Sequence, residues 1–180
     1  FRTQVGTDIF NEYSPLGVPT GLVNRVTFDG STVLFKDSWE PAIQELLAIP
    51  AQAYIEVVPE YNEGTRKLDL QVKSEFLEDI DASCNLSILI IESGIISPQK
   101  NDLASIGPEP NWLDYEHKHM LRGAVNGTWG EFLVENPGSG DVIESDFSIT
   151  LDSDWDAQNV AVVAILLDAD TYEIIQVEEV

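Results

Sequence analysis

The feature that most constrains the fold is an alternation of apolar and polar residues, which runs from about residue 51 to the end of the chain. In residues 67–77 four apolar side chains share one face: Leu68, Leu70, Val72 and Phe76. Residues 144–151 repeat the pattern with Phe147, Ile149 and Leu151. A period of two is typical of a β-strand with one buried face and one solvated face. This part of the chain is therefore predicted to form antiparallel sheets.

Eight segments have this strand-like character, and short turn sequences separate them. They are residues 52–60, 67–77, 83–92, 115–125, 129–134, 144–151, 159–168 and 172–179. Val160 to Leu167 is apolar on both faces, which predicts a central strand. About seven to eight strands in a stretch of this length favour a mainly β protein, an immunoglobulin-like antiparallel β-sandwich.

The first 50 residues differ from the rest in charge and in pattern. Residues 1–50 carry 3 basic and 6 acidic side chains, a net of −3, and residues 51–180 carry 6 and 26, a net of −20. Strands are predicted at 22–26 and 32–35 around an Asp29-Gly30 turn, followed by a helix from Ser38 to about Ile49. The chain is thus predicted to consist of a β-β-α unit (1–50) and a sandwich domain (51–180).

Composition excludes several classes of function. The net charge of −23 is incompatible with a nucleic-acid partner, which needs clustered lysine and arginine. The longest apolar run, Val160 to Leu167, is too short for a membrane-spanning helix. The single cysteine, Cys84, lies in an apolar alternating stretch and is expected to be a buried hydrophobe. No catalytic set is assembled in the sequence, so no cofactor and no enzymatic activity are expected.

Two groups of residues are candidate metal ligands. His117 and His119 would point to the same face of a strand, where both rings could bind a transition metal, with Glu92 or Asp114 as a third ligand. The alternative is that the rings hydrogen-bond to neighbouring strands. Asp152, Asp154 and Asp156 alternate in a loop, and their hard oxygen ligands would suit calcium. The alternative there is a solvated loop.

Two further features bear on recognition of a partner. Trp39, Trp112, Trp129 and Trp155 would form a carbohydrate-stacking platform if exposed together, although their scattered positions favour core packing and loop lids. Residues 97–111 contain Pro98, Pro108 and Pro110 and are predicted to be a long structureless loop, a type of segment that often carries recognition. A protein or glycan surface ligand is therefore the expected partner.

Two stretches carry a resemblance to known families. Gly17-Val18-Pro19-Thr20, followed by a strand, a turn, a strand and a helix, resembles the second half of a thioredoxin fold, where the proline is usually cis. Further segments resemble the outer membrane protein 28 family: Tyr115 to Arg122, Trp129-Gly130-Glu131, Asn159 to Leu167, and Ile174-Ile175-Gln176. The resemblance implies a Gram-negative cell-surface lipoprotein, located at the outer membrane or in the periplasm. It also implies a thioredoxin-like region joined to a C-terminal β-sandwich.

This resemblance implies an adhesin-like or receptor-like interaction module without an established reaction. The chain departs from a redox-active thioredoxin-like protein because it has no Cys-x-x-Cys pair. We therefore expect it to begin partway through the thioredoxin-like region. The alternative function is that of a fragment of a thiol-disulfide exchange protein whose cysteine pair lies upstream.

Overall fold

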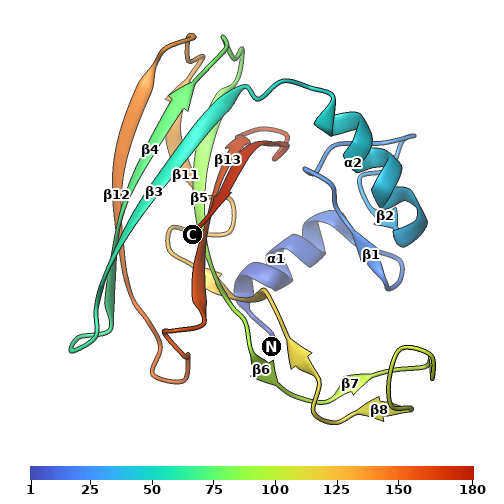
Figure 1. Ribbon diagram of the computed structural model, residues 1–180. Coiled ribbons are helices and arrows are strands. Elements are labelled where there is room, and N and C mark those ends of the chain that lie inside the picture. The colour runs from blue at the N-terminus through green and yellow to red at the C-terminus, as the bar shows by residue number, and fades with distance from the viewer.

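The computed structural model describes residues 1–180, and its centre is a sandwich of two antiparallel sheets (Figure 1). One sheet has three strands in the order β12-β4-β3, which span Val142–Thr150, Lys67–Phe76 and Ala53–Asn62. The second sheet has the order β10-β5-β13-β14, and β11 also pairs with β5. Its strands are β5 (Ser83–Glu92), β10 (Met120–Ala124), β11 (Glu131–Glu135), β13 (Val160–Asp168) and β14 (Ile174–Glu179).

The order of the strands confirms the predicted immunoglobulin-like architecture. With β10 and β11 counted together as the fourth strand, the first, second and fifth main strands (β3, β4 and β12) form one sheet, and the third, sixth and seventh (β5, β13 and β14) form the other. This is the distribution of strands A, B, E and C, F, G in an immunoglobulin-like sandwich. β10 and β11 follow one another along the free edge of β5.

The main core lies between the two sheets. Its buried side chains come from the inward faces that the alternation predicted, with Leu70 and Phe76 on β4, Leu86 on β5 and Leu166 on β13 almost fully buried. The central position predicted for Val160 to Leu167 is confirmed, because β13 pairs with β5 on one side and β14 on the other. The alternation of apolar and polar residues within each strand thus determines which side chains form the core.

The second face of the five-stranded sheet is also apolar, which explains why β13 lacks a polar face. Leu89, Ile165 and Leu167 point away from the main core and form a second cluster with Val5. Val5 belongs to α1 (Gln4–Tyr13), a helix that Thr3 caps by accepting a hydrogen bond from the Gly6 N–H at 3.0 Å. No helix of the protein is long and apolar enough to cross a membrane.

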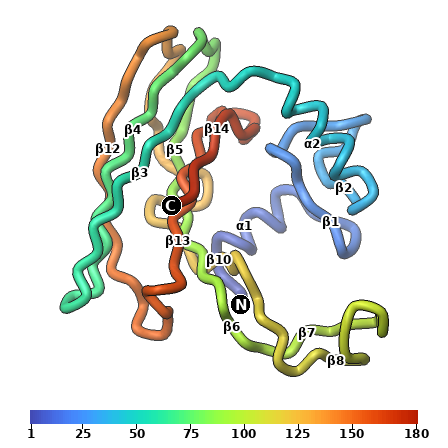
Figure 2. Tube along the Cα trace, in the orientation of Figure 1, coloured from blue at the N-terminus to red at the C-terminus, as the bar shows by residue number.

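The rest of the first 50 residues forms a small β-β-α unit beside the sandwich (Figure 2). It contains β1 (Thr20–Gly21), β2 (Leu34–Phe35), a 3₁₀ turn η1 (Lys36–Ser38) and α2 (Trp39–Leu47). The predicted strand at 22–26 is wrong, because β1 precedes it and residues 24–25 form a turn with positive φ. The Asp29-Gly30 turn is confirmed, and the Val18-Pro19 peptide bond is cis.

A projecting arm replaces the structureless loop predicted for residues 97–111. It is built from two short ladders, β6 (Ile95–Ile96) with β9 (Glu116–His117) and β7 (Gln99–Lys100) with β8 (Asn111–Trp112). The Asn101 side chain donates hydrogen bonds to the carbonyls of Leu103 and Gly107, at 3.1 and 2.9 Å, and so closes the tip. Backbone pairing therefore orders this segment, although no alternation of apolar and polar residues in the sequence predicts it.

Candidate interaction surface

The first 50 residues expose an unusual amount of apolar surface. Only four of them are buried: Val5, Arg25, Leu34 and Ala42. Eight large apolar side chains of this part are exposed: Phe1, Phe10, Leu16, Val18, Phe35, Ile43, Leu47 and Ile49. Many large apolar side chains exposed on one part of a folded protein point to a site of interaction. We call these eight residues the N-terminal apolar face.

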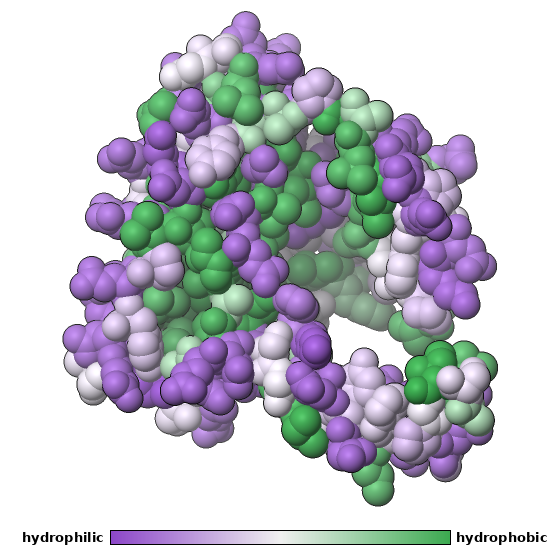
Figure 3. All heavy atoms as spheres, viewed as in Figure 1, coloured by the Kyte–Doolittle hydropathy of each residue, from purple (hydrophilic) through white to green (hydrophobic).

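The arm adds further apolar side chains on the same side of the sandwich. Ile96, Leu103, Ile106 and Leu113 are each more than half exposed. The space-filling view shows the molecule hollowed between the first 50 residues and the arm, with green hydrophobic residues on both sides of the hollow (Figure 3). The candidate interaction surface therefore combines the N-terminal apolar face with the arm.

Concave sites lie along this surface. A cavity of about 340 Å³ lies between α1 and β1, and Ile9, Phe10, Tyr13 and Leu22 are among its lining residues. A neighbouring cavity of about 470 Å³ shares Gly6 and Phe10 with it. The first cavity has a mostly apolar lining, which is the usual form of a binding site. The exposed ring of Phe10 is the side chain that lines both cavities.

A third cavity, of about 540 Å³, separates the β-β-α unit from the sandwich. The end of α2 supplies Leu46 and Leu47 to its lining, and the β13–β14 hairpin supplies Glu173 and Ile174. The Ile174 N–H donates to the Asn24 carbonyl at 2.8 Å beside it. The β-β-α unit thus contacts the sandwich through a narrow join beside this cavity.

An aromatic cluster fastens the β-β-α unit at that join. Trp129 stacks on Tyr172, with ring centroids 4.1 Å apart and an interplanar angle of 12°. Tyr13, at the end of α1, meets the Trp129 ring edge-on at 6.4 Å. The Arg25 guanidinium lies 5.2 Å from the centroid of the Trp129 ring, a cation–π arrangement. Four residues from four separate parts of the chain therefore meet here.

Burial changes the titration of this cluster. Desolvation lowers the pKa of Arg25 and raises that of Tyr13, because in both cases the charged form is the one disfavoured. Arg25 has no carboxylate partner, and its one hydrogen bond, to the Tyr172 carbonyl, is 3.4 Å long. The indole ring is therefore the main counterpart of this charge, so the cluster is a structural join.

A row of aromatic rings supports the base of the arm. Phe1 and His117 lie 4.9 Å apart, His117 and Tyr115 also 4.9 Å, and Tyr115 and Trp112 5.4 Å. Trp112 covers Gly107, where a Cβ would overlap the indole ring. The arm is thereby held by ring packing as well as by its backbone ladders.

The structure separates the two histidines predicted to share one face of a strand. β9 ends at His117, and His119 has a φ of +51°, so residues 115–125 are not one continuous strand. The buried His117 ring lies 3.2 Å from the Ser97 carbonyl, as the hydrogen-bonding alternative predicts. The exposed His119 ring lies 3.3 Å from Glu179 instead. Glu92 pairs with Arg122 at 3.0 Å.

The three aspartates proposed for calcium lie in the loop before β13, and the carboxylates of Asp152 and Asp156 accept hydrogen bonds within that loop. Asp152 accepts from the Asp154 N–H at 2.9 Å, and Asp156 accepts from Gln158 and Asn159 at 3.1 and 2.9 Å. No group of three metal-ligating side chains forms anywhere in the chain. A cofactor-free protein nevertheless stays a prediction, as does calcium binding.

Cys84 is fully buried between the sheets, and desolvation raises the pKa of its thiol to about 11. A thiol with that pKa has almost no thiolate at neutral pH, and the thiolate is the reactive form. The four tryptophans lie apart, on α2, on the arm, in the aromatic cluster and against the main core. They do not form one stacking platform.

Sequence reasoning missed most of the interaction surface. α1 had a detectable signal, because Val5 and Ile9 are four residues apart behind a threonine cap. No sequence signal indicated that Leu16, Val18 and Leu47 are exposed, because apolar residues in a strand or helix are expected to be buried.

The fold and this surface define a class, a β-sandwich protein with an apolar appendage. Residues 7–180 match the model of the outer membrane protein Omp28 family. The chain therefore belongs to the Omp28 family. The predicted location, outer membrane-associated at the bacterial cell surface or in the periplasm, is confirmed by this membership.

Among solved structures, the chain is similar to a domain of the outer membrane lipoprotein Omp28 from Porphyromonas gingivalis. The two are 27% identical with a TM-score of 0.49, over 73% of this chain and 89% of that one. No curated protein matches the chain. The thioredoxin-like kinship of the β-β-α unit stays a prediction.

Proposed function

We propose that this protein is a non-enzymatic binding module of the outer membrane surface, adhesin-like or receptor-like, which holds a protein partner on its N-terminal apolar face. The observation that carries the proposal is the exposure of eight large apolar side chains on a unit that buries only four of its 50 residues. Covering such a surface with a partner lowers the free energy, because apolar side chains are removed from water. Membership of an outer membrane family supports the proposal, because a protein at the outer membrane can meet other proteins.

The chemistry of the other candidates supports binding over catalysis. The two histidines have separate partners, the carboxylates of Asp152 and Asp156 bond within their own loop, and the cysteine is buried with a raised pKa. A glycan ligand has weaker support than a protein, because the tryptophans lie apart. Thiol-disulfide exchange is unsupported by the described residues.

The test is a binding screen with a matched pair of variants. The immobilised protein is presented with host matrix proteins and with glycans, and any binder is measured again on Phe10→Ala and Phe132→Ala. The two rings are 57% and 64% exposed, but Phe10 lines the cavities beside α1 and Phe132 lies on β11 of the sandwich. We expect Phe10→Ala to weaken binding about tenfold and Phe132→Ala to leave it unchanged.

Two results would contradict the proposal. One is hydrolytic turnover of a bound molecule by the purified protein. The other is equal loss of affinity in both variants, because the apolar face would then have no special part in binding.

A further inference from the structure

A second surface, remote from the apolar face, is formed by the free edge of β12. This strand is the outermost of its sheet and pairs with β4 alone (Figure 1). The pairing runs without a register shift through nine residue pairs, from Val142↔Glu75 to Thr150↔Lys67. The opposite side of β12 therefore presents a straight row of backbone groups to solvent.

Two hydrogen bonds determine which backbone groups face that side. The Leu151 N–H donates to the Arg66 carbonyl, and the Phe76 N–H donates to the Asp141 carbonyl, both at 2.9 Å. Odd-numbered residues of the strand therefore bond to β4, because bonded and non-bonded pairs alternate along an antiparallel ladder. The even-numbered residues direct their N–H and C=O groups outward: Val142, Glu144, Asp146, Ser148 and Thr150.

The other long edges of the sandwich are protected, and this one is not. β3 contains Pro59, and its neighbour β14 contacts it through a 2.8 Å hydrogen bond from the Gln176 amide to the Ala53 carbonyl. β10 and β11 each have a register shift against β5. Proline, bulges and covering segments are the usual means of blocking strand addition. β12 has no proline and no bulge.

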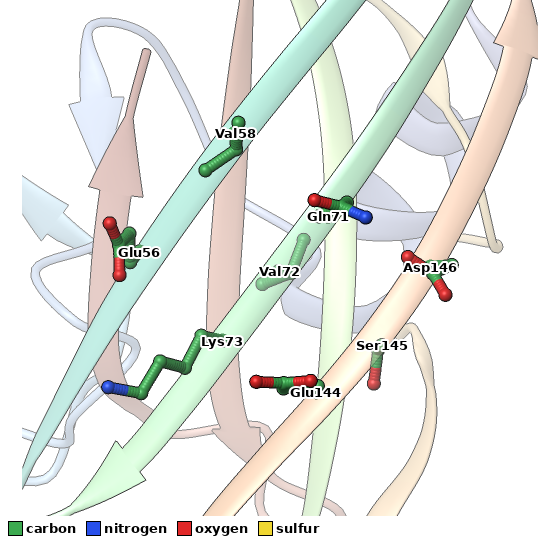
Figure 4. A pocket seen from close by; sticks show the side chains of 8 residues that line it. All are labelled: Glu56, Val58, Gln71, Val72, Lys73, Glu144, Ser145 and Asp146. Atoms are coloured by element: carbon green, nitrogen blue, oxygen red, sulfur yellow. The ribbon is translucent and has the colours of Figure 1, made fainter.

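The side chains of β12 differ sharply between its two faces. Ile143, Phe147 and Ile149 point inward against the core and stay partly exposed at the open side of the sandwich. Glu144 and Asp146 point outward, Glu144 opposite Lys73 and Asp146 opposite Gln71 of β4 (Figure 4). Lys73 pairs with Glu75 of its own strand at 3.2 Å, so the two carboxylates of β12 have no ion pair.

We infer that the free edge of β12 binds an extended segment of a basic partner protein as an added strand. The partner's backbone bonds to the even-numbered residues, and lysine or arginine side chains on its outer face meet Glu144 and Asp146. Apolar side chains on its inner face cover Phe147 and Ile149. The inference goes beyond the apolar face and does not depend on it.

Charge favours such a partner over a second copy of this chain. Two copies of β12 side by side would bring Glu144 and Asp146 against the same carboxylates, and each chain carries a net charge of −23. Like charges directly opposite each other destabilise a strand pair. A basic strand would instead be attracted to the carboxylates of Glu144 and Asp146.

The test measures binding of a synthetic peptide with the nine-residue length of β12, made of alternating valine and lysine with blocked ends. A block peptide of the same composition, with its lysines together, controls for plain charge attraction. The protein variants are Ser148→Pro and Ser148→Ala. The Ser148 N–H faces outward, so proline removes no bond to β4 and leaves the net charge unchanged.

We expect the alternating peptide to bind the wild-type protein and Ser148→Ala alike. Ser148→Pro should weaken binding about tenfold, the effect of one lost hydrogen bond. The block peptide should also bind about tenfold more weakly, because its lysines cannot all lie on the outer face. The N–H groups of Glu144, Asp146 and Ser148 should exchange more slowly with the peptide bound.

Absence of binding to the wild-type protein would overturn the inference, and so would equal binding of the two peptides or of the two Ser148 variants. Concentration-dependent dimers joined along β12 would assign the edge to a second copy instead and also overturn it. If Ser148→Pro does not fold, an alternating peptide N-methylated along its pairing edge replaces it. Unchanged affinity for that peptide would refute strand addition.

Discussion

Gly130 shows how tightly single residues are specified at the edge of the sandwich. Its φ is +71°, and a Cβ there would overlap the Leu86 carbonyl. We predict that Gly130→Ala lowers the free energy of unfolding by about 3 kcal/mol, the sum of left-handed strain and overpacking. Gly127 also has a positive φ, +91°, but has open space around it. Gly127→Ala should therefore cost about 1 kcal/mol.

Urea denaturation of the two glycine variants measures this difference. Because both positions carry positive φ, the comparison isolates the steric contact with Leu86. Equal destabilisation of the two variants would show that this contact is relieved by movement of the chain.

Cys84 is predicted to be inert in the folded protein. Its burial and its pKa of about 11 leave neither access nor thiolate for a thiol reagent. Labelling with a chromogenic disulfide at pH 8 should be slow without denaturant and fast in urea. Labelling of the folded protein at the rate of the unfolded chain would contradict the burial of this thiol.

Asp168 is predicted to contribute pH-dependent stability at the β13–β14 turn. Its carboxylate accepts backbone N–H bonds from Asp170 and Thr171, both at 2.8 Å, and the bond from Thr171 is the main reason that its pKa is lowered. The folded-state pKa is below the unfolded one, so the contribution is present above about pH 4 and is lost as the pH falls. Because the group is largely solvated, Asp168→Ala should cost only about 1 kcal/mol at pH 7.

The check on Asp168 is the difference in unfolding free energy between the wild-type protein and Asp168→Ala at several pH values. That difference should shrink below pH 4. A difference that stays constant down to pH 3 would show that the carboxylate's charge has no part in it.

Among the elements, those with a strict period of two could be predicted from the sequence, and those held by tertiary contacts could not. β4, β12 and β13 match their predicted segments within about two residues, because the alternation both identifies the strand and selects its buried face. The break between β9 and β10 was missed, because the left-handed turn at His119 lies in a segment that otherwise alternates.

The anchoring of the β-β-α unit makes a prediction at the scale of elements. Trp129 is the ring on which Tyr172, Tyr13 and Arg25 converge. Trp129→Ala should lower the free energy of unfolding by about 3 kcal/mol and release residues 14–36 to proteolysis, while the sheet signal in circular dichroism persists. Trp112→Ala, a change in the arm, should leave that segment's cleavage rate unchanged. Equal cleavage in the two variants would mean that the cluster does not anchor the unit.

At the scale of the whole molecule, the candidate surface depends on what is left uncovered after folding. The alternation assigns side chains to an inner or an outer face, so it predicted the main core. It gives no information on Leu16, which is fully exposed, or on the arm, because neither follows a period. Their exposure emerges only when the sandwich and the β-β-α unit are placed side by side.

The dependence of the sandwich on α1 yields the last prediction. Val5 of α1 covers Leu89, Ile165 and Leu167 on the outer face of the five-stranded sheet. A fragment of residues 51–180 should keep its β-sheet spectrum, because both sheets lie within it. It should nevertheless bind a hydrophobic dye and melt about 10 °C lower than the whole chain, since the loss of about 3 kcal/mol of apolar burial shifts a domain of this size by that amount.

The control is the whole chain carrying Ile43→Ala and Leu47→Ala on α2, two side chains that are 43% and 73% exposed. It should melt within a degree or so of the wild-type protein, because surface substitutions away from the core change stability little. If the fragment melts with the whole chain and binds no dye, α1 contributes nothing to the sandwich, and residues 1–50 form a separable appendage. If the fragment loses its sheet spectrum, the second apolar cluster is as necessary to the fold as the main core.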